Sequence, residues 1–243
     1  LVGSEMCIRD RPCSLHILPD SNLAAAENMA RDFLLLNHYP EPSSIRLRHY
    51  GWERPSYTFG LGQSYQYARS EISVLDADFV RRPTGGGVVD HHHDWTFSLI
   101  IPASHSLGQL QPIETYKSVH QCIVLAMKSQ GAKVALNENA PSDSIPRVCF
   151  EKPEVYDVIL ENLSAKVAGA AQKRTKSGYL MQGSIWKPTL PNLDWISFHN
   201  DFMDEIAKLT DAKKSFVPWP KWDHELISGC LSRFESAEWN QRR

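Results

Sequence analysis

The sequence has few cysteines, no long apolar run and no excess of either charge. Its five cysteines show no CxxC spacing, so we expect thiols in a reducing compartment, with neither a disulfide framework nor a zinc site. The longest apolar run, residues 97–103, is interrupted and too short to cross a bilayer. Because no charged-then-apolar leader opens the sequence, we expect no secretory signal and a cytoplasmic protein.

Composition narrows the class of protein further. The 26 basic and 28 acidic residues give a net charge of −2, which predicts no overall electrostatic attraction to nucleic acid or to a membrane. Hydrophobic residues make up 42% and charged residues 22% of the 243 residues, as in ordinary globular domains. This excludes a disordered chain, a collagen-like repeat and a coiled-coil rod. We expect a monomer.

The first residues need separate treatment. Leu1 to Arg11 (LVGSEMCIRDR) resemble a translated sequencing adapter, so we exclude them and Cys7 from the fold and expect them to be disordered. The alternative is a frayed native terminus. We predict a single domain over residues 12–243.

Hydrophobic periodicity predicts short strands with few helices between them. Ser21 is predicted to cap a helix that runs to Leu36, and Trp95 to Ile101 alternate as in a half-buried strand. The other predicted strands cover 45–50, 56–60, 79–80, 132–136, 155–160, 166–172 and 178–185, and the other helices 116–127, 201–209 and 224–234. Strands without a regular βαβ rhythm favour an α+β domain with mixed or antiparallel sheets flanked by helices.

The densest motif is the glycine-rich segment Arg81–His91 (RRPTGGGVVDH). Three consecutive glycines allow the backbone to approach a ligand closely, and Arg81 and Arg82 could add positive charge for phosphate or carboxylate. The segment is not a Walker A loop, because no Gly-Lys-Ser/Thr follows. It is not a dinucleotide fingerprint either, because a strand is predicted after it instead of a helix. The plain alternative is a glycine-rich turn between two strands.

The triplet His91, His92 and His93, followed by Asp94, raises the question of a metal site. On a strand, only His91 and His93 would share one face, and no HExxH motif supplies further ligands. We therefore predict no metal site and expect polar residues that line a pocket.

Two further residues could carry chemistry. Cys149 follows the polar stretch 137–147, which predicts a long loop, and a cysteine on a loop is a nucleophile when its surroundings lower the thiol pKa. A small buried apolar side chain is the alternative. Lys166 precedes a run of small residues and could hold a carboxyl, a phosphate or a thioester carbonyl, unless it is only an exposed lysine on a strand edge.

Together these segments resemble the lipoate/octanoate transfer family, which comprises lipoate–protein ligases and cysteine-dependent octanoyltransferases. The segment Arg81–His91 is similar to the family's RRxTGGGxVxH motif, and residues 166–172 with 178–185 are similar to its K(I/V)xGxAQ…HGSI block. Residues 50–63 resemble its YxWxxPxxSxGxxQ strand pair, and 238–240 a common C-terminus of the family. The resemblance spans residues 22–240 and implies the class II synthetase-like fold of biotin–protein ligase.

Within the family, the resemblance is greatest to the octanoyltransferases, because Cys149-Phe150…Pro153…Tyr156-Asp157 is similar to their cysteine segment. It implies that Cys149 takes an octanoyl group from acyl carrier protein as a thioester and passes it to a lysine of a lipoyl domain, with no cofactor. Lys166 would orient the acyl carbonyl. The implied substrate-binding residues are Arg81, Arg82, Thr84, Gly85, Gly86, Gly87, His91, Gly169 and Gln172.

The implied acceptor is the glycine-cleavage carrier protein or a 2-oxoacid dehydrogenase subunit. One alternative is an ATP-dependent lipoate–protein ligase that forms lipoyl-adenylate, needs ATP and Mg, and uses Cys149 only for packing. A second is a non-catalytic binder of lipoyl domains. The sequence departs from the family at Gln182, where many relatives have histidine.

Overall fold

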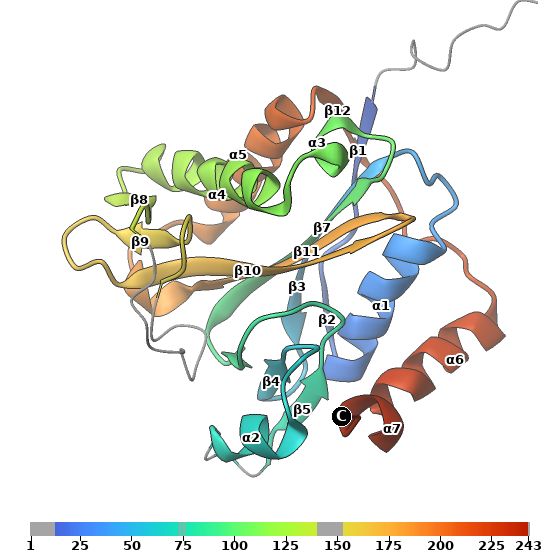
Figure 1. Cartoon of the computed structure of the whole chain (residues 1–243). Helices are drawn as coiled ribbons and strands as arrows, with labels where there is room; N and C mark the ends of the chain where they lie inside the picture. Colours follow the sequence, from blue (N-terminus) through green and yellow to red (C-terminus); the bar gives the residue numbers. More distant parts are fainter. Residues whose placement is uncertain (1–12, 73, 75, 140–152, 243) are drawn as a thin grey trace, which may run out of the picture.

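A twisted nine-stranded sheet with helices on both faces forms the body of the protein, and a three-stranded sheet lies below it (Figure 1). The structure is a computed structural model that describes residues 13–72, 74, 76–139 and 153–242. Residues 1–11 and most of the predicted loop 137–147 lie outside the described residues. This arrangement confirms the predicted α+β class with mixed sheets flanked by helices.

The large sheet has parallel strands at one edge and antiparallel strands across its centre. Its order is β12 (Ala212–Phe216), β1 (Cys13–Ile17), β3 (Ile45–Trp52), β7 (Asp94–Pro102), β11 (Gly178–Trp186), β10 (Lys166–Thr175), β9 (Val158–Leu160) and β8 (Val134–Leu136), and β2 (Ser21–Leu23) pairs with β3. The small sheet has the order β5 (Asp78–Arg81), β4 (Ser56–Phe59) and β6 (Val89–Asp90).

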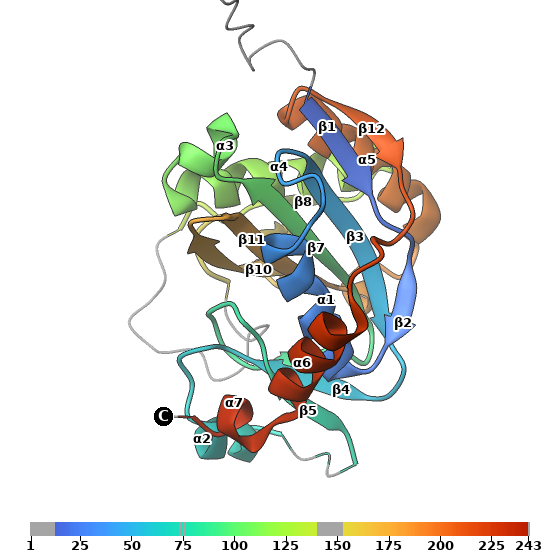
Figure 2. The same ribbon diagram turned by 90° about the vertical axis from the view of Figure 1, so that its right-hand side faces the viewer.

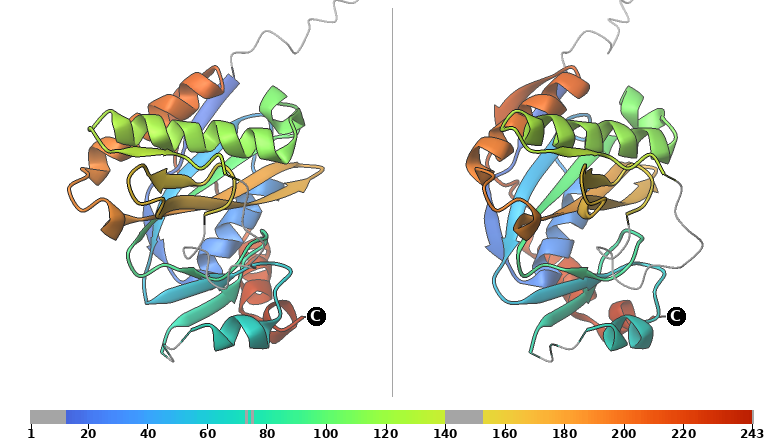
Figure 3. Two further views of the ribbon diagram at one scale, coloured as in Figure 1. Left: turned by 60° about the vertical axis from the view of Figure 1, so that its left-hand side comes forward. Right: turned by 90° about the vertical axis from the view of Figure 1, so that its left-hand side faces the viewer.

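Helices cover both faces of the large sheet. The pair α4 (Pro112–Lys128) and α5 (Trp195–Leu209) lies on one face, and the pair α1 (Ala25–Asn37) and α6 (His224–Glu235) lies on the other (Figures 1 and 3). The short helices are α2 (Tyr65–Ser70), α3 (Ser106–Gln109), α7 (Ala237–Asn240) and the 3-10 turn Lys187–Thr189. No helix in the described part of the chain is long and apolar enough to cross a membrane.

Strand β7 shows why the sheet centre differs from its prediction. All nine residues are buried, not only the apolar alternate positions. Trp95, Phe97, Leu99 and Ile101 belong to the core that includes residues of α4 and α5, whereas Ser98 faces the other side and donates a hydrogen bond to Asp32 on α1. The polar positions of the alternation therefore face a buried polar network instead of solvent, so the prediction of a half-buried strand was wrong.

Other differences concern the beginnings of elements and the sheet edge. Ser21 lies in β2 and does not cap a helix, because α1 begins at Ala25 after Ala24. Helix α5 begins earlier than predicted, where the Asp194 carboxylate accepts hydrogen bonds from the first turn. Strands β1 and β12 were not predicted, since each has only five residues and they pair with each other from opposite ends of the sequence. The remaining predicted strands and helices are present within a few residues of their expected bounds.

Two glycines offer a matched test of this packing. A Cβ on Gly183, at the centre of β11, would lie 2.1 Å from the ring of the buried Phe97 on β7. A Cβ on Gly229, within α6, meets no atom within 4 Å. We predict that Gly183→Ala lowers the free energy of unfolding by about 1–3 kcal/mol through overpacking, and that Gly229→Ala raises it by about 0.5–1 kcal/mol through helix propensity. Urea denaturation measures both, and equal changes in the two variants would contradict this account of the sheet centre.

Candidate active site

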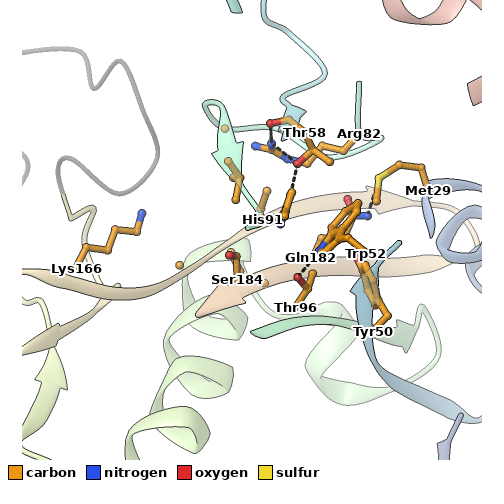
Figure 4. Close-up of a pocket in the computed structure, with 16 residues that line it drawn as sticks. Met29, Tyr50, Trp52, Thr58, Arg82, His91, Thr96, Lys166, Gln182 and Ser184 are labelled. Atoms are coloured by element: carbon orange, nitrogen blue, oxygen red, sulfur yellow. Dashed lines mark hydrogen bonds between the residues drawn. The ribbon is translucent and has the colours of Figure 1, made fainter. Parts of the chain in front are cut away.

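A cavity lies between the centre of the large sheet and the glycine-rich segment (Figure 4). Strands β10 and β11 provide one wall, β3 and β4 a second, and the residues between β5 and β7 a third. The lining residues are Met29, Tyr50, Trp52, Thr58, Arg82, Gly86, Val89, His91, Thr96, Lys166, Gly169, Ala170, Ala171, Gln182, Gly183 and Ser184.

The glycine-rich segment packs backbone against backbone on the end of β4. A Cβ on Gly60 would lie 1.9 Å from the carbonyl oxygen of Gly86, and Gly86 itself has a φ of +85°. Only glycine allows this approach at Gly60, and the left-handed φ favours glycine at Gly86. Arg82 holds the same segment, because its guanidinium donates hydrogen bonds to the carbonyl oxygens of Gly85 and Thr58. The segment after β5 is thus a fixed wall of the cavity, and the short strand β6 follows it as predicted.

Arg81 points away from this cavity toward the C-terminal residues. Its guanidinium donates to the carbonyl oxygens of Leu61 and Gln63 at 2.8 and 2.7 Å, and to that of Asn240 at 2.8 Å. Its backbone N–H donates to Asn240 Oδ1 at 2.8 Å, and its carbonyl accepts from Trp239 Nε1 at 2.7 Å. The two adjacent arginines therefore differ. Arg82 lines the cavity, whereas Arg81, the last residue of β5, binds β5 to the C-terminal helix α7.

A buried carboxylate on α1 ties the helix to the floor of the cavity. Asp32 Oδ2 accepts hydrogen bonds from Ser98 Oγ at 2.5 Å, Gln182 Nε2 at 2.7 Å and Tyr50 Oη at 3.3 Å. Arg48 Nη1 lies 3.3 Å from Asp32 Oδ1, and both side chains are fully buried. Burial raises the pKa of Asp32, although Arg48 and the three donors favour the carboxylate. Four side chains from β3, β7 and β11 thus meet at this one carboxylate of α1.

Gln182 links this carboxylate to the glycine-rich segment. Its Nε2 donates to Asp32, and its Oε1 accepts from Thr84 Oγ1 at 2.7 Å. The network fixes the orientation of the amide, because only its nitrogen can donate to a carboxylate. Thr84 therefore supports the cavity wall through Gln182 and does not line the cavity itself.

A second buried carboxylate lies on the opposite side of the cavity. Asp94 Oδ2 accepts from Ser184 Oγ at 2.6 Å, His91 Nδ1 at 2.7 Å and Thr96 Oγ1 at 2.8 Å. Burial alone would raise the pKa of Asp94, but the attraction of His91 and these three hydrogen bonds hold it below its ordinary value. His91 Nε2 in turn lies 2.9 Å from Thr58 Oγ1. The residues 91–93 form a bend between β6 and β7 and not the strand assumed for them, so the three imidazoles do not alternate between two faces.

Lys166 is buried at the other end of the cavity, where it pairs with a carboxylate (Figure 4). Its Nζ lies 2.8 Å from Asp157 Oδ2, and the Tyr116 hydroxyl donates to Asp157 Oδ1. That hydroxyl also accepts a hydrogen bond from the Ala170 N–H at 3.1 Å. A Cβ on Gly169 would lie 2.7 Å from Lys166 Nζ and 2.9 Å from Asp157 Oδ1, so a glycine there leaves room for the pair.

The described residues on both sides of the segment 140–152 lie close to this pair. Asn137 Nδ2 donates to the carbonyl oxygen of Glu154 at 3.0 Å and contacts those of Asn139 and Pro153 at 3.4 and 3.5 Å. Asp157 Oδ2 accepts from the Glu154 N–H at 2.6 Å. Asn137 and Asp157 thus hold both ends of the segment 140–152 next to Lys166. Cys149 belongs to that segment and lies outside the described residues.

The predicted site residues divide into two groups. Five of them line the cavity: Arg82, Gly86, His91, Lys166 and Gly169. Five others support or flank it without lining it: Arg81, Thr84, Gly85, Gly87 and Gln172. Sequence reasoning missed Asp32, Arg48, Thr58 and Tyr116. A charged residue on the apolar face of a predicted helix, as at Asp32, is the signal that could have identified the first of these. Among the residues that the structure describes, no group of three or more His, Cys, Asp or Glu side chains could hold a metal ion.

Comparison with known proteins gives one family. Residues 24–202 match the lipoyl protein ligase A/B catalytic domain. The octanoyltransferase LipM of Bacillus anthracis is 34% identical over 271 residues, covering 90% of this chain and 94% of that protein. The LipM of Halalkalibacterium halodurans is also 34% identical, over 175 residues that cover 66% of this chain and 61% of that protein. The matched region thus spans less than two thirds of the Halalkalibacterium protein.

Solved structures share the fold at low sequence identity. A putative lipoate protein ligase from T. acidophilum with bound lipoic acid has a TM-score of 0.72 at 15% identity, covering 94% of this chain and 99% of that one. A lipoate-protein ligase A bound with ATP has a TM-score of 0.74 at 14% identity, covering 94% of this chain and 98% of that one. These likenesses agree with the architecture described above.

The buried Lys166–Asp157 pair gives a stability prediction. Asp157→Asn removes the charge from a fully buried position and leaves a buried ammonium without its carboxylate partner, which costs roughly 3–5 kcal/mol of unfolding free energy. The matched change Glu161→Gln breaks the exposed pair with Lys128, whose charged atoms lie 3.0 Å apart, and costs about 1 kcal/mol or less. Chemical denaturation of both variants measures the difference. Similar losses would show that Lys166 does not depend on Asp157.

A buried histidine behind the same pair predicts a pH dependence. His120 stacks on Tyr116 with ring centroids 3.9 Å apart, and burial lowers the pKa of His120 to about 4. Between about pH 6.5 and pH 4 the unfolded chain binds a proton that the folded protein does not, so stability is full above this window and falls through it by up to about 3 kcal/mol. His120→Asn keeps a donor for the Tyr116 carbonyl and removes the titrating group. Its stability should fall less on acidification than that of the wild type, and parallel curves would contradict the prediction.

Proposed function

The chain belongs to the lipoyl protein ligase A/B catalytic domain family, and from this premise we propose that it is an octanoyltransferase. It moves an octanoyl group from acyl carrier protein to a lysine of a lipoyl domain, through a thioester on Cys149. The name of the LipM relatives supports this activity. The observation that carries the proposal is that Asn137 and Asp157 hold both ends of the segment containing Cys149 beside the buried Lys166.

The other cysteines of the described structure are poor nucleophiles. Burial raises the pKa of the Cys122 thiol to about 12, and it also raises the pKa of the Cys13 and Cys230 thiols. Because the thiolate is the reactive form, these three residues are unsuited to covalent catalysis. Cys149 is four residues before Pro153 in the sequence, and four residues of extended chain span at most about 14 Å. Pro153 and the next residue, Glu154, lie beside Asn137 and Asp157.

The chemistry consists of two acyl transfers. The Cys149 thiolate attacks the carbonyl carbon of the donor thioester, the bond to the donor sulfur breaks, and the carrier leaves as a thiol after gaining a proton. A neutral amine of the acceptor lysine then attacks the carbonyl carbon of the new thioester, the bond to the Cys149 sulfur breaks, and the proton that the nitrogen loses goes to that sulfur, so that the amide and the free thiol form. The first step exchanges one thioester for another and the second converts a thioester into a more stable amide, so neither needs ATP. Lys166, an ammonium with three donors, is suited to hold the carbonyl oxygen as negative charge develops on it.

The cavity lining suits an acyl chain. Met29, Trp52 and Val89 give it apolar walls, and Ala170 and Ala171 line it with small apolar side chains. Lys166 and Arg82 supply the charged side chains of the lining. A long apolar tail with one polar end matches this distribution better than a polar metabolite does. The glycine-cleavage carrier protein and the lipoyl domain of a 2-oxoacid dehydrogenase are the acceptors we propose.

Intact mass spectrometry tests the proposal. The protein is mixed with octanoyl acyl carrier protein without ATP, next to Cys149→Ala and the matched variant Cys13→Ala. We expect the wild type and Cys13→Ala to gain one octanoyl group that hydroxylamine removes, and Cys149→Ala to gain none. A lipoyl domain added to the acylated protein should then acquire the octanoyl group.

Other results would identify other functions. If no adduct forms and the lipoyl domain is modified only when lipoate, ATP and Mg are supplied, the protein is a lipoate–protein ligase and Cys149 has a packing role. If the lipoyl domain binds and is modified under neither condition, the protein is a non-catalytic binder.

A further inference from the structure

A series of hydrogen bonds links helix α4 to the lysine at the end of the cavity. The N–H of Ala170, on β10, donates to the Tyr116 hydroxyl at 3.1 Å. That hydroxyl donates to Asp157 Oδ1, and Asp157 Oδ2 lies 2.8 Å from Lys166 Nζ. An N–H can only donate and an ionised carboxylate can only accept, so the single proton of the hydroxyl points at Asp157. The direction of each hydrogen bond in the series is therefore fixed.

The end of strand β9 explains why a side chain of α4 is needed here. Strands β9 and β10 are antiparallel, and Val158, the first residue of β9, pairs with Ala168. Two residues further along β10, the N–H of Ala170 lies past the end of β9 and donates to the Tyr116 hydroxyl instead of to a strand. An N–H without an acceptor would cost free energy here. The hydroxyl thus takes the place of a strand beside a residue that lines the cavity.

The backbone before Asp157 turns sharply. Tyr156 has a φ of +67°, a left-handed conformation that is costly for a residue with a side chain and persists only where the surroundings require it. Beyond this turn, Asp157 Oδ2 accepts a hydrogen bond from the Glu154 N–H at 2.6 Å. Both oxygens of the carboxylate are therefore occupied, Oδ1 by Tyr116 and Oδ2 by Glu154 and Lys166.

The occupation of Oδ1 restricts where the ammonium of Lys166 can lie. A lysine ammonium is a compact charge on a flexible stem, so a carboxylate with two available oxygens can bind it from several directions. With Tyr116 on Oδ1, the ammonium lies at Oδ2. The lysine stem lies against β10, because a Cβ on Gly169 would be 2.6 Å from Lys166 Cε.

The ring of Tyr116 is itself held in place. His120, one turn further along α4, stacks on it with ring centroids 3.9 Å apart, and His120 Nδ1 lies 2.9 Å from the Tyr116 carbonyl oxygen. Burial lowers the pKa of His120 to about 4, so the stacked imidazole is uncharged at neutral pH. The stack contains no hydroxyl, so Tyr116→Phe removes the hydrogen bonds of the series and keeps the packing of the ring.

We propose that Tyr116 is a positioning residue for acyl transfer, which acts through Asp157 to hold the Lys166 ammonium toward the acyl carbonyl. The inference rests on the proposed function, in which the carbonyl carbon is attacked twice and its oxygen gains negative charge each time. A single group can serve both attacks only if its nitrogen stays in one place. The hydroxyl of Tyr116 provides this constraint from the face of the sheet that α4 covers.

Tyr116→Phe tests the proposal in both half-reactions. Mass spectrometry measures the rate of acyl-enzyme formation from octanoyl acyl carrier protein and the rate of octanoyl transfer to a lipoyl domain, each over a range of substrate concentrations. We expect the rate at saturation to fall by about 10–100-fold in both steps, as for a reacting group displaced by up to about 1 Å. The concentrations that give half the maximal rate should stay within about twofold of the wild type, because substrate binding is not affected.

Two further variants accompany it. Tyr179→Phe is the matched control, because Tyr179 on β11 is also buried and its hydroxyl donates to the Pro112 carbonyl at the start of the same helix, at 3.4 Å. It should react at the wild-type rate in both steps. Gly169→Ala displaces the ammonium from the other side, since its Cβ would lie 2.7 Å from Lys166 Nζ, and it should show the same pattern of rates as Tyr116→Phe.

A double variant shows whether Tyr116 acts through the lysine. Lys166→Met removes the ammonium, and its slow reaction is followed over hours. Adding Tyr116→Phe to it should cause no further loss of rate, because two residues of one network do not act additively.

The ammonium also has a spectroscopic signature that does not depend on turnover. In protein with ¹⁵N-labelled lysine, a buried ammonium held by a carboxylate exchanges its protons slowly and gives its own signal, which Lys166→Met identifies by its loss. Proton exchange should become faster in Tyr116→Phe and stay unchanged in Tyr179→Phe. A wild-type protein without this signal would show that the ammonium is not held, and would overturn the proposal.

Three kinetic results would also overturn it. One is wild-type rates in both Tyr116→Phe and Gly169→Ala. The second is a higher half-maximal concentration without a lower rate at saturation, which would assign Tyr116 to substrate binding. The third is a full further loss when Tyr116→Phe is added to Lys166→Met, which would show an action independent of the lysine.

The two proposals can fail separately. If the wild type forms no acyl-enzyme, the proposed function fails, and the ammonium signal still decides whether Tyr116 holds Lys166. If the acyl-enzyme forms but proton exchange of Lys166 is the same in Tyr116→Phe as in the wild type, the positioning role alone is overturned.

Discussion

The buried carboxylate of Asp32 is the point through which helix α1 and the centre of the sheet hold each other. A carboxylate without water needs several donors, and here they come from Ser98 on β7, Gln182 on β11 and Tyr50 on β3, with the Arg48 charge beside them. Each donor fixes the position of one strand relative to the helix. Because Gln182 also binds Thr84, the same carboxylate positions the glycine-rich segment, and the wall of the cavity depends on the packing of a helix that contributes only Met29 to the lining.

Two separate sets of buried residues hold the polar side chains that line the cavity. Lys166 is held by Asp157 and Tyr116, which belong to the side of the sheet that α4 covers. His91 and Thr58 are held by Asp94, Trp52 and Arg82, which belong to the junction between the two sheets. Each polar side chain of the lining has its own buried partners, so the site is organised before any ligand binds. Such preorganised donors and acceptors are what stabilises developing charge in an acyl transfer.

The sequence predicts the central strands, the last helices and the position of the glycine-rich segment, because periodicity and glycine clusters are local signals. It does not predict β1 and β12, since five-residue strands become stable only through pairing across the whole chain. Lys166, Arg82 and His91 stand out as polar residues beside glycines, and all three line the cavity. Thr58 and Tyr116 look ordinary in the sequence, because their roles arise from partners far away in it. The adjacent Arg81 and Arg82 show the same limit, since no local pattern distinguishes a guanidinium that faces the cavity from one that binds C-terminal carbonyls.

The contacts of Arg81 have a consequence for biosynthesis. Residues 81 and 240 meet through both backbone and side chain, and the ribosome makes the second some 159 residues after the first. The nascent chain can form α1, β3 and the small sheet early, but the strand before the glycine-rich segment gains its anchor only when translation has passed Asn240. Domains generally fold as units during synthesis, and contacts so distant in sequence form slowly. A protein made in this order would fix the glycine-rich wall of the cavity last. An incomplete translation product that ends before Asn240 would therefore have this wall without the hydrogen bonds between Arg81 and Asn240.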